Sequence, residues 1–343
     1  MPYSNWSLWG TVKYTSVMSL SSAHTKHAEL TRSQTWYYKN HCLSLPIILD
    51  HLYFIFKATF DLGVYPQEWK QSITAVLRKP GKPNYKLAKA YRPIALLNTI
   101  PKVLTSIIAE NITHLVEKHS LLPKTHFGGR PGHTTGDVVH YLVHRIKEAW
   151  QRGKAVSILF LDVEGAFPNA VTDRLIHNLR KRKIPKVYMD FIERLLPNRK
   201  TKLKFDDFMS ELINIDNGLG QGDPLSMVLY IIYNADLLEL VDIEDNKDAV
   251  GYVDDATILA IGDDIGETTD KLHLIMHEEG GGLTWSEDHN SRFEVSKLVL
   301  MHAVRPRQID ELETRPRLEI NCQIVTEVNS YKYLGVHIDN RLQ

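Results

Sequence analysis

Apolar residues recur along the chain in two patterns that predict its main strands and helices. A continuous apolar run over 156–161 predicts a strand, and two β-prone runs over 250–253 and 256–261 predict a hairpin. Further strands are expected over 72–77, 91–97 and 331–338, and the segment 291–300 is expected to end in a strand just after Lys297. Helical spacing predicts helices over 45–61, 102–118, 135–150 and 263–279, and after Pro168 and Asp223. Residues 1–45 show no sustained period, so we leave them unassigned and expect them to be partly disordered.

Carboxylates stand where several of these predicted strands end. Asp254 and Asp255 lie between the two β-prone runs, where a hairpin would hold both in its turn. Asp162 directly follows the apolar run over 156–161. Mg²⁺ prefers oxygen ligands, and carboxylates at neighbouring strand ends can hold two such ions ~4 Å apart for phosphoryl transfer. Taken singly, Asp162 fits a helix-capping aspartate as well as a metal ligand, and Asp254 and Asp255 fit a plain turn as well as a metal site.

Three motifs in one order decide between these alternatives. They are FLDVEGAF over 160–167, GLGQGDPLS over 218–226 and YVDD over 252–255. Together they resemble the reverse transcriptases of non-LTR, LINE-like retrotransposons, and more narrowly those of fungal elements. The resemblance runs from about Leu62 to the C-terminus. It implies an α+β right-hand polymerase fold, with fingers over about 46–153 and a palm over about 154–343 whose antiparallel sheet packs on helices.

The resemblance also implies a reaction: RNA-templated DNA synthesis, in which a primer 3′-hydroxyl attacks a dNTP, as part of a retrotransposon polyprotein. Asp162, Asp254 and Asp255 would bind two Mg²⁺ ions, which Mn²⁺ could replace. The expected partners are an RNA template, a DNA primer or an RNA–DNA hybrid, and dNTPs. Lys297 resembles the palm lysine that protonates the departing pyrophosphate, although a lysine at a strand start is usually only solvated.

Six residues are expected by resemblance at the incoming nucleotide: Lys79, Lys82, Arg92, Phe167, Gln221 and Gly222. The cations would contact the triphosphate. The ring of Phe167 would lie beneath the sugar and leave no room for a 2′-hydroxyl; the alternative is plain aromatic packing. Gln221 and Gly222 belong to a flexible loop. We expect Lys86 and Lys89 to be ordinary surface lysines.

Two segments are expected at the nucleic acid. Arg130, in the loop over 126–135, would contact a template phosphate. The alternative for this loop, which does not exclude the first, is a helix-capping turn with Thr134 or Thr135 as the N-cap. Tyr333, Leu334 and Gly335 lie in a segment that resembles the strand gripping the primer end.

Composition is compatible with this interpretation but does not reveal it. The 343 residues carry 41 basic and 41 acidic side chains, and zero net charge argues against a nucleic-acid binder. The charges are segregated, however. Residues 78–92 hold six basic side chains and no acid, residues 174–204 are also basic, and acids crowd into 236–270. Such segregation can place a basic groove over an acidic site; solvated helix faces are the alternative for 180–183.

The remaining signals set limits. Two cysteines are too few for a disulfide framework. No apolar run reaches ~18 residues and no targeting signal is recognised, so we expect no membrane segment and an intracellular location, in the cytoplasm or nucleus. The helical thumb that the resemblance implies is missing from this sequence, and the oligomeric state is not indicated. Two alternatives stay open: a non-catalytic nucleic-acid-binding remnant, and an RNA-dependent RNA polymerase, against which Phe167 argues.

Overall fold

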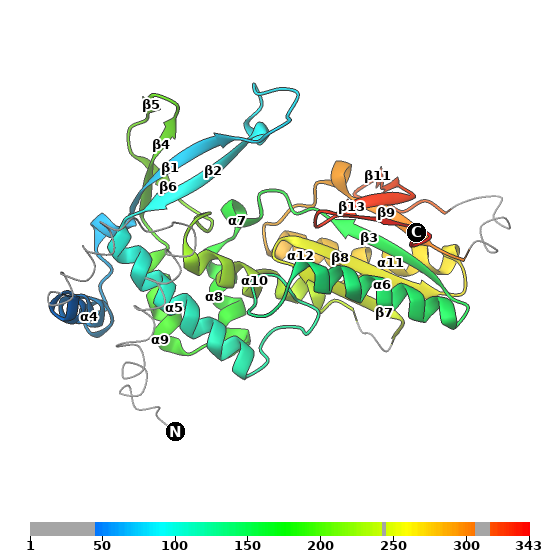
Figure 1. Ribbon diagram of the computed structural model, residues 1–343, viewed down its shortest axis with the longest axis horizontal. Coiled ribbons are helices and arrows are strands. Elements are labelled where there is room, and N and C mark those ends of the chain that lie inside the picture. Colours follow the sequence, from blue (N-terminus) through cyan, green and yellow to red (C-terminus); the bar gives the residue numbers. More distant parts are fainter. Residues whose placement is uncertain (1–44, 242–244, 306–315) are drawn as a thin grey trace, which may run out of the picture.

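Two β-sheets and the helices around them form the part of the chain that the structure describes. In the computed structural model these are residues 45–241, 245–305 and 316–343 (Figure 1). The unassigned segment over 1–45 lies outside this part, apart from its last residue. A projecting lobe holds the first sheet and the wider body holds the second. We call them the fingers sheet and the palm sheet, after the expected architecture.

The fingers sheet has the strand order β2-β1-β4-β5, with β6 paired to β4. Its strands are β1 (Gln71–Arg78), β2 (Tyr91–Leu97), β4 (Arg199–Phe205), β5 (Phe208–Met209) and β6 (Ile213–Ile215). β1 and β2 form an antiparallel hairpin, whereas β1 and β4 run parallel. The chain therefore returns from the palm to complete this sheet. The fingers sheet therefore contains strands from both sides of the expected domain boundary near residue 153: β1 and β2 precede it, and β4 to β6 follow it. The domain limits stay a prediction.

The palm sheet has the order β12-β9-β3-β8-β7. Its strands are β3 (Ala155–Leu161), β7 (Lys247–Tyr252), β8 (Asp255–Gly262), β9 (Val299–Ala303) and β12 (Thr326–Glu327). Every pair is antiparallel except β12 with β9. Every residue of β3 is buried, because helices or a hairpin cover both faces of this central strand. Its apolar run is therefore continuous rather than alternating.

Helices and short hairpins pack on the palm sheet and continue beneath the fingers sheet (Figure 1). The helices are α4 (Leu45–Asp61), α5 (Thr99–Lys118), α6 (Thr135–Gln151), α7 (Ala166–Asn169), α8 (Thr172–Lys181), α9 (Lys186–Leu195), α10 (Pro224–Leu238), α11 (Ile265–His277) and α12 (Gly282–Asp288). The hairpins pair β10 (Glu319–Ile320) with β11 (Gln323–Ile324) and β13 (Ser330–Tyr333) with β14 (Val336–Asp339). Single 3₁₀ turns are η1 (Gln67–Lys70), η2 (Ala88–Ala90) and η4 (Val295–Lys297).

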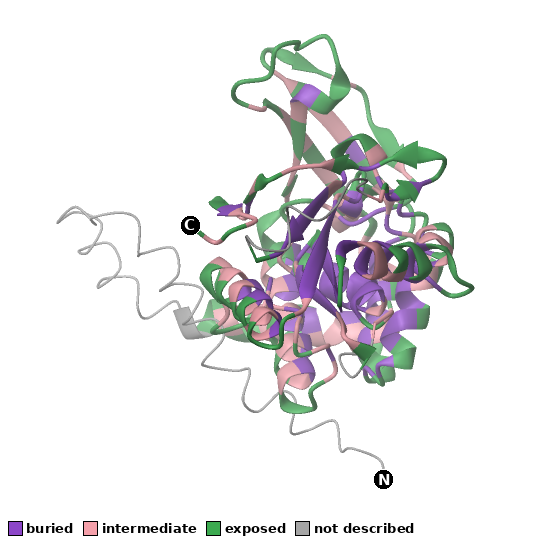
Figure 2. Ribbon diagram, turned by 90° about the vertical axis from the view of Figure 1, so that its right-hand side faces the viewer, coloured by how far each residue is buried: buried purple, intermediate pink, exposed green. Residues whose placement is uncertain are grey.

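Alternating side chains of β3 divide the core into two layers. Leu159 and Leu161 join the cluster formed with α10, α11 and α12, whereas Ile158 and Phe160 join the cluster formed with α6 and the β13–β14 hairpin. Buried residues concentrate in these layers, and the fingers lobe is mostly exposed or half-buried (Figure 2). Within the described residues, no helix has both the length and the apolar character needed to cross a membrane.

Several predicted elements need correction. The segment over 331–338 is a hairpin rather than one strand, because Leu334 and Gly335 adopt positive φ angles of 48° and 87° and turn the chain. The strand predicted at the end of 291–300 is confirmed, since β9 begins at Val299. The strands β4 to β6 and the helix α9 were not predicted at all. The helix over 45–61 is confirmed, and Thr134 caps α6 through a reciprocal capping box with Asp137.

The β7–β8 turn has a strained backbone. Tyr252 pairs with Asp255, so Val253 and Asp254 alone form the turn. Val253 adopts a φ of 60°, in the left-handed region that a β-branched residue rarely enters. Such a conformation persists only where the surroundings hold it in place.

A loop and a helix hold this turn. The loop over 126–135 runs beside β7, where the backbone nitrogen of Phe127 donates a hydrogen bond to the carbonyl of Gly251. Gly128 packs on the turn so closely that an added Cβ would lie 2.3 Å from the Val253 nitrogen. Asn234 of α10 donates its amide to the Val253 carbonyl. The turn is therefore fixed from two sides.

His126 completes this support as a neutral side chain. It is fully buried, and its Nε2 lies 3.1 Å from Oδ1 of Asn234. Because the Asn234 amide nitrogen already donates to the turn, Oδ1 must accept from His126. Burial lowers the pKa of His126 to about 4. An unfolded histidine titrates near 6.5, so the unfolded chain binds this proton first as the pH falls.

We predict that His126→Gln changes how stability depends on pH. The stabilisation from a neutral His126 is complete above pH ~6.5 and is lost as the pH falls towards 4, whereas glutamine keeps the donor and does not titrate. Between pH ~7.5 and ~5, the difference in unfolding free energy should move in favour of the variant by about 2 kcal/mol. Urea denaturation at both pH values measures it. The exposed His114, changed to glutamine, is the control, and a parallel pH response of His126→Gln and wild type would contradict the prediction.

Candidate active site

Strand pairing brings three carboxylates to one edge of the palm sheet. Leu161, the last residue of β3, pairs with Ala256 of β8. Asp162 therefore follows β3 at the level where Asp255 begins β8 and Asp254 occupies the turn. Both aspartates were expected in the turn; Asp255 instead pairs with Tyr252 as a strand residue. The edge thus gathers carboxylates from two distant parts of the chain.

These carboxylates disfavour one another's charge. Desolvation raises the pKa of Asp254; the hydrogen bond from its own backbone amide opposes this, the charge of Asp162 raises the pKa further, and Arg92 lowers it least. Desolvation, then the charge of Asp254, then that of Asp162 raise the pKa of Asp255 to about 6. Both side chains nevertheless keep solvent-exposed surface. The edge is an acidic site reached by water but crowded by protein.

A divalent cation fits the chemistry of this donor set. Carboxylate oxygens are the ligands that Mg²⁺ and Mn²⁺ prefer, and a cation would relieve the repulsion that raises the two pKa values. The side chains are not yet gathered as ligands, however: within the described residues, no group of three potential ligands has a metal-binding arrangement. Asp162 is instead 3.3 Å from the Lys297 amine. The residues fit a metal, but their side chains would have to turn towards it.

Lys297 lies at the site rather than being merely solvated. It is the last residue of the short turn η4 and contacts both Asp162 and Glu294. Burial lowers its pKa, but the hydrogen bond with Glu294 and the charges of both acids outweigh burial and raise it. Glu294 also lies 3.9 Å from Lys89 of the fingers. Glu294 therefore links the palm to the fingers across the site.

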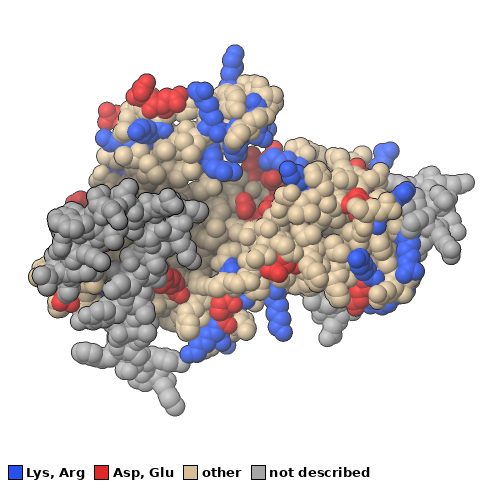
Figure 3. Space-filling model, in the orientation of Figure 1, with Lys and Arg blue, Asp and Glu red and all other residues tan. Residues whose placement is uncertain are grey.

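A cleft of about 570 Å³ extends from the carboxylates to the fingers. The predicted residues that line it are Lys79, Arg92, Phe167, Gln221, Asp162, Asp254, Asp255 and Lys297. Acidic side chains lie inside this hollow and basic ones stand along its upper side (Figure 3). Lys82 and Gly222 do not line it. Lys89, expected to be an ordinary surface lysine, does.

Phe167 forms part of the cleft floor. Its ring stacks on that of Tyr230 in α10, with centroids 4.6 Å apart. Its carbonyl accepts a hydrogen bond from Leu219, which fastens the glycine-rich loop over 218–222 to α7. The side chain is only half-buried, so one side of the ring remains available to a ligand.

The glycine-rich loop is fixed to both lobes. The backbone carbonyl of Gln221 accepts a hydrogen bond from the Ala95 nitrogen of β2 at 2.7 Å. An added Cβ on Gly222 would lie 2.7 Å from the Ala95 carbonyl oxygen, so this residue permits close packing on the fingers. At Gly218 an added Cβ would lie 2.3 Å from the Pro168 carbonyl oxygen. Gly222 thus has a packing role, and its contact with a nucleotide stays a prediction.

Arg130 is engaged inside the protein. Its guanidinium makes a bidentate pair with Glu117 at 2.7 and 2.8 Å. It also donates to the carbonyls of Pro123 and His126. These bonds brace the loop over 126–135, which supports the β7–β8 turn. The predicted template phosphate would have to compete with them.

The β13–β14 hairpin lies on the palm beside the carboxylates. Tyr333 is buried against Phe160, with ring centroids 5.1 Å apart. Leu334 and Gly335 form the hairpin tip. Tyr331 also packs on Phe160, with ring centroids 4.6 Å apart, and the charge of Asp255 contributes, after burial, to raising the pKa of Tyr331. The contact of this hairpin with a primer stays a prediction.

The basic run over 180–183 is partly neutralised within the fold. Arg182 is buried and pairs with Asp236 at 2.6 Å and Glu239 at 2.9 Å. Lys181 contacts the same two acids. These two residues therefore join α8 to α10 instead of forming a free basic surface.

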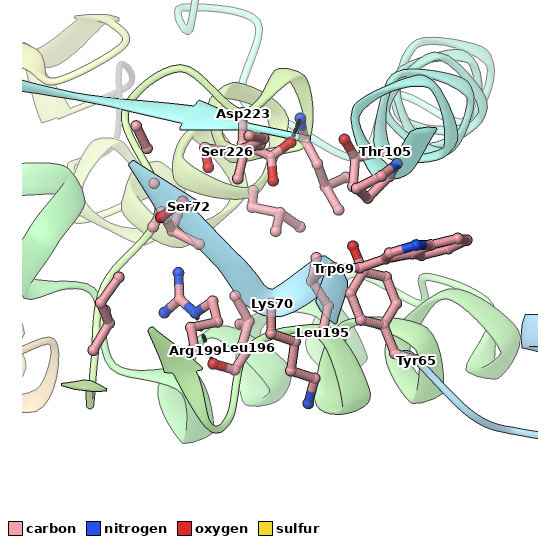
Figure 4. A pocket seen from close by; sticks show the side chains of 18 residues that line it. Tyr65, Trp69, Lys70, Ser72, Thr105, Leu195, Leu196, Arg199, Asp223 and Ser226 are labelled. Carbon is pink, nitrogen blue, oxygen red and sulfur yellow. Dashed lines mark hydrogen bonds between the residues drawn. The ribbon is translucent and has the colours of Figure 1, made fainter. Parts of the chain in front are cut away.

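A second, enclosed cavity of about 50 Å³ lies between the base of the fingers and α10. Figure 4 shows Asp223 and Arg199 on opposite sides of it, with Tyr65 and Trp69 closing one end. Burial raises the pKa of Asp223 and lowers that of Arg199. Asp223 caps α10 by accepting from the Leu225 nitrogen at 3.0 Å, so this cavity belongs to the frame of the glycine-rich loop.

Sequence reasoning missed Glu294, Lys89 and Asn234. Glu294 and Lys89 come from loops without a periodic pattern, and only the pairing of distant segments brings them together. Asn234 carried a weak signal, since it is a polar residue within an otherwise apolar helix. A buried polar side chain of this kind needs a hydrogen-bond partner, which here is the Val253 carbonyl in the β7–β8 turn.

The comparisons with known proteins agree with this geometry. Residues 77–338 match the family described as "Reverse transcriptase (RNA-dependent DNA polymerase)". A probable RNA-directed DNA polymerase from the Drosophila melanogaster transposon X-element is 29% identical over 300 residues, covering 84% of this chain and 31% of that protein. The polymerase of the mobile element jockey from the same species is 25% identical, over 86% of this chain and 31% of its own length.

Solved structures show the same fold at low identity. Apo telomerase from Candida tropicalis matches with a TM-score of 0.55 and 10% identity, over 86% of this chain and 53% of that chain. A version truncated from its C-terminal domain matches with a TM-score of 0.53. The right-hand polymerase fold is thereby confirmed, and the expected fungal origin stays a prediction. This chain spans about a third of the curated relatives, at 31% of each. The chain belongs to the reverse transcriptase family and is similar to the RNA-directed DNA polymerases of non-LTR retrotransposons.

Proposed function

We propose that this chain is the fingers and palm of an RNA-templated DNA polymerase that adds dNTPs to a primer 3′-hydroxyl. The observation that carries the proposal is the gathering of Asp162, Asp254 and Asp255 at the head of a cleft with basic walls. The family match supports the reaction class. A solved structure with the same fold, a Candida tropicalis telomerase, is in complex with a fragment of telomeric RNA, which supports RNA as a partner.

Two Mg²⁺ ions, or Mn²⁺ in their place, would be held by the three carboxylates. Such ions activate the attacking hydroxyl and neutralise the charge of the triphosphate. The protein's part is to hold the reacting groups in line and to supply fixed charge, which accounts for most of the catalysis in phosphoryl transfer.

Side chains around the cleft have separate roles in this proposal. Lys79 and Arg92 attract the triphosphate from the fingers side. Phe167 supports the sugar. Lys297 stays protonated beside Asp162 and Glu294, so it can hold a proton close to the departing pyrophosphate. Glu294 positions Lys297 through their ion pair.

We predict that Asp254→Asn abolishes nucleotide addition without unfolding the protein. Asparagine keeps the shape of the turn but removes the charge that metal ions require. The rate of single-nucleotide incorporation on a DNA-primed RNA template should fall by roughly a thousandfold or more. Asp270→Asn, an exposed position on α11, is the control and should keep the wild-type rate. Retained incorporation by Asp254→Asn would refute the site, and failure of the wild type would favour an inactive nucleic-acid-binding remnant.

We predict that Phe167→Val admits ribonucleotides. Removing the ring opens space beside the sugar, so the preference for dNTPs over rNTPs, taken as the ratio of kcat/KM values, should fall about 10- to 100-fold. Phe208→Val, on the exposed tip of the fingers, provides the control. An unchanged ratio would mean that Phe167 only packs on Tyr230. A wild type that prefers rNTPs would instead identify an RNA-dependent RNA polymerase.

A further inference from the structure

The β4 strand presents a row of lysines on one face of the fingers sheet. Side chains alternate along a strand, so Lys200, Lys202 and Lys204 project from one side. Thr201 projects from the other, where its hydroxyl lies 2.8 Å from that of Thr74. This strand belongs to the basic segment over 174–204, and the proposed active site leaves its lysines unused.

The lysine row faces away from the palm. Arg199 shares the face of Thr201, and its guanidinium donates to the carbonyl of Gly218 in the glycine-rich loop. That face therefore looks towards the cleft and the palm. The lysines project from the opposite, outer face.

Apolar side chains continue this outer face across the sheet. Ile73 of β1 pairs with Lys202, and Leu96 of β2 pairs with Ile73. Both apolar side chains are exposed, Ile73 by 37% and Leu96 by 52%. The outer face thus combines a row of cations with an uncovered apolar strip. The strip leads from the lysines to β2, the strand that lines the cleft.

The three lysines are not neutralised by the fold. No described residue forms an ion pair with any of them, whereas Arg182 and Lys181 of the same basic segment are paired with acids of α10 and its C-cap. Three like charges side by side on one strand repel one another. Their row therefore suits a polyanion.

The spacing of the row selects the kind of polyanion. Alternate residues of a strand lie ~6.7 Å apart, a repeat that can follow successive phosphates of an extended chain. A basic surface that tracks the backbone is typical of sites for single-stranded nucleic acids, and the exposed Ile73 and Leu96 beside it offer apolar surface to unstacked bases. The row lies two strand spacings, ~10 Å, from β2, within reach of a strand leaving the cleft.

We propose that the outer face of the fingers sheet binds the phosphate backbone of the single-stranded RNA that is about to be copied. Lys200, Lys202 and Lys204 contact successive phosphates, and Ile73 and Leu96 contact the bases. The identification of this RNA as template rests on the proposed function, whereas the binding of single-stranded RNA to the face does not.

The salt dependence of RNA binding tests this surface. The triple variant Lys200→Gln, Lys202→Gln, Lys204→Gln is compared with wild type and with Lys118→Gln, Lys124→Gln, Lys147→Gln, which removes the same charge elsewhere. Fluorescence anisotropy follows binding of a labelled single-stranded RNA of about 15 nucleotides between about 50 and 200 mM KCl. Log K falls as log salt rises, and each lost phosphate contact makes this negative slope shallower by ~0.7. The β4 variant, which loses three contacts, should therefore have a slope that is less negative than that of wild type by about 2. Equal slopes for the two triple variants would overturn the proposal, as would an equal change with double-stranded RNA.

Primer extension separates this inference from the proposed function. With a long unpaired template overhang, the β4 variant should show a raised KM for the template–primer and an unchanged kcat, and with a short overhang it should match wild type. A KM that rises equally for both overhangs would overturn the template assignment. If wild type extends no primer at all, the proposed function fails, and the salt slope still decides whether this face binds single-stranded RNA.

Discussion

Repulsion among three carboxylates is the constraint on which the rest of this structure depends. Pairing of β3 with β8 places Asp162 beside Asp254 and Asp255, and each negative charge makes the next less favourable. A fold that only needed stability would gain from separating them. The palm sheet instead fixes them at its edge, buries the strands behind them and leaves water access in front. Such an arrangement is useful where a cation joins the site.

The same framework stabilises the strained backbone of the β7–β8 turn. Val253 adopts a left-handed conformation that costs of order 1–3 kcal/mol for a residue with a Cβ. Gly128 packs beneath it, and Asn234 holds its carbonyl from α10, with His126 completing the network. Arg130 and Glu117 then brace the supporting loop. The glycine-rich loop is fixed in a comparable way, between α7 of the palm and β2 of the fingers.

The sequence predicted the elements whose side chains form one continuous or periodic apolar pattern. The strand before Asp162 and the helix over 45–61 belong to this class. Strands β4 to β6 were missed because half their residues are exposed and β4 alternates lysines with Thr201, Leu203 and Phe205, a period of two that charge obscured. The three carboxylates were found from motif order. Arg130 was assigned to a template because sequence does not show that Glu117 is within reach, and Glu294 was missed because only the tertiary fold brings it to Lys297.

The central claim is that carboxylates from distant segments act as one catalytic unit. A double-mutant cycle of Asp162→Asn and Asp254→Asn tests it most directly, with single-nucleotide incorporation on a DNA-primed RNA template as the measured rate. Groups that act as a unit are strongly non-additive, so each single variant should lose nearly all activity and the double variant should be no slower than either. A double variant whose loss equals the product of the two single losses would show that the carboxylates act independently, which would contradict this account.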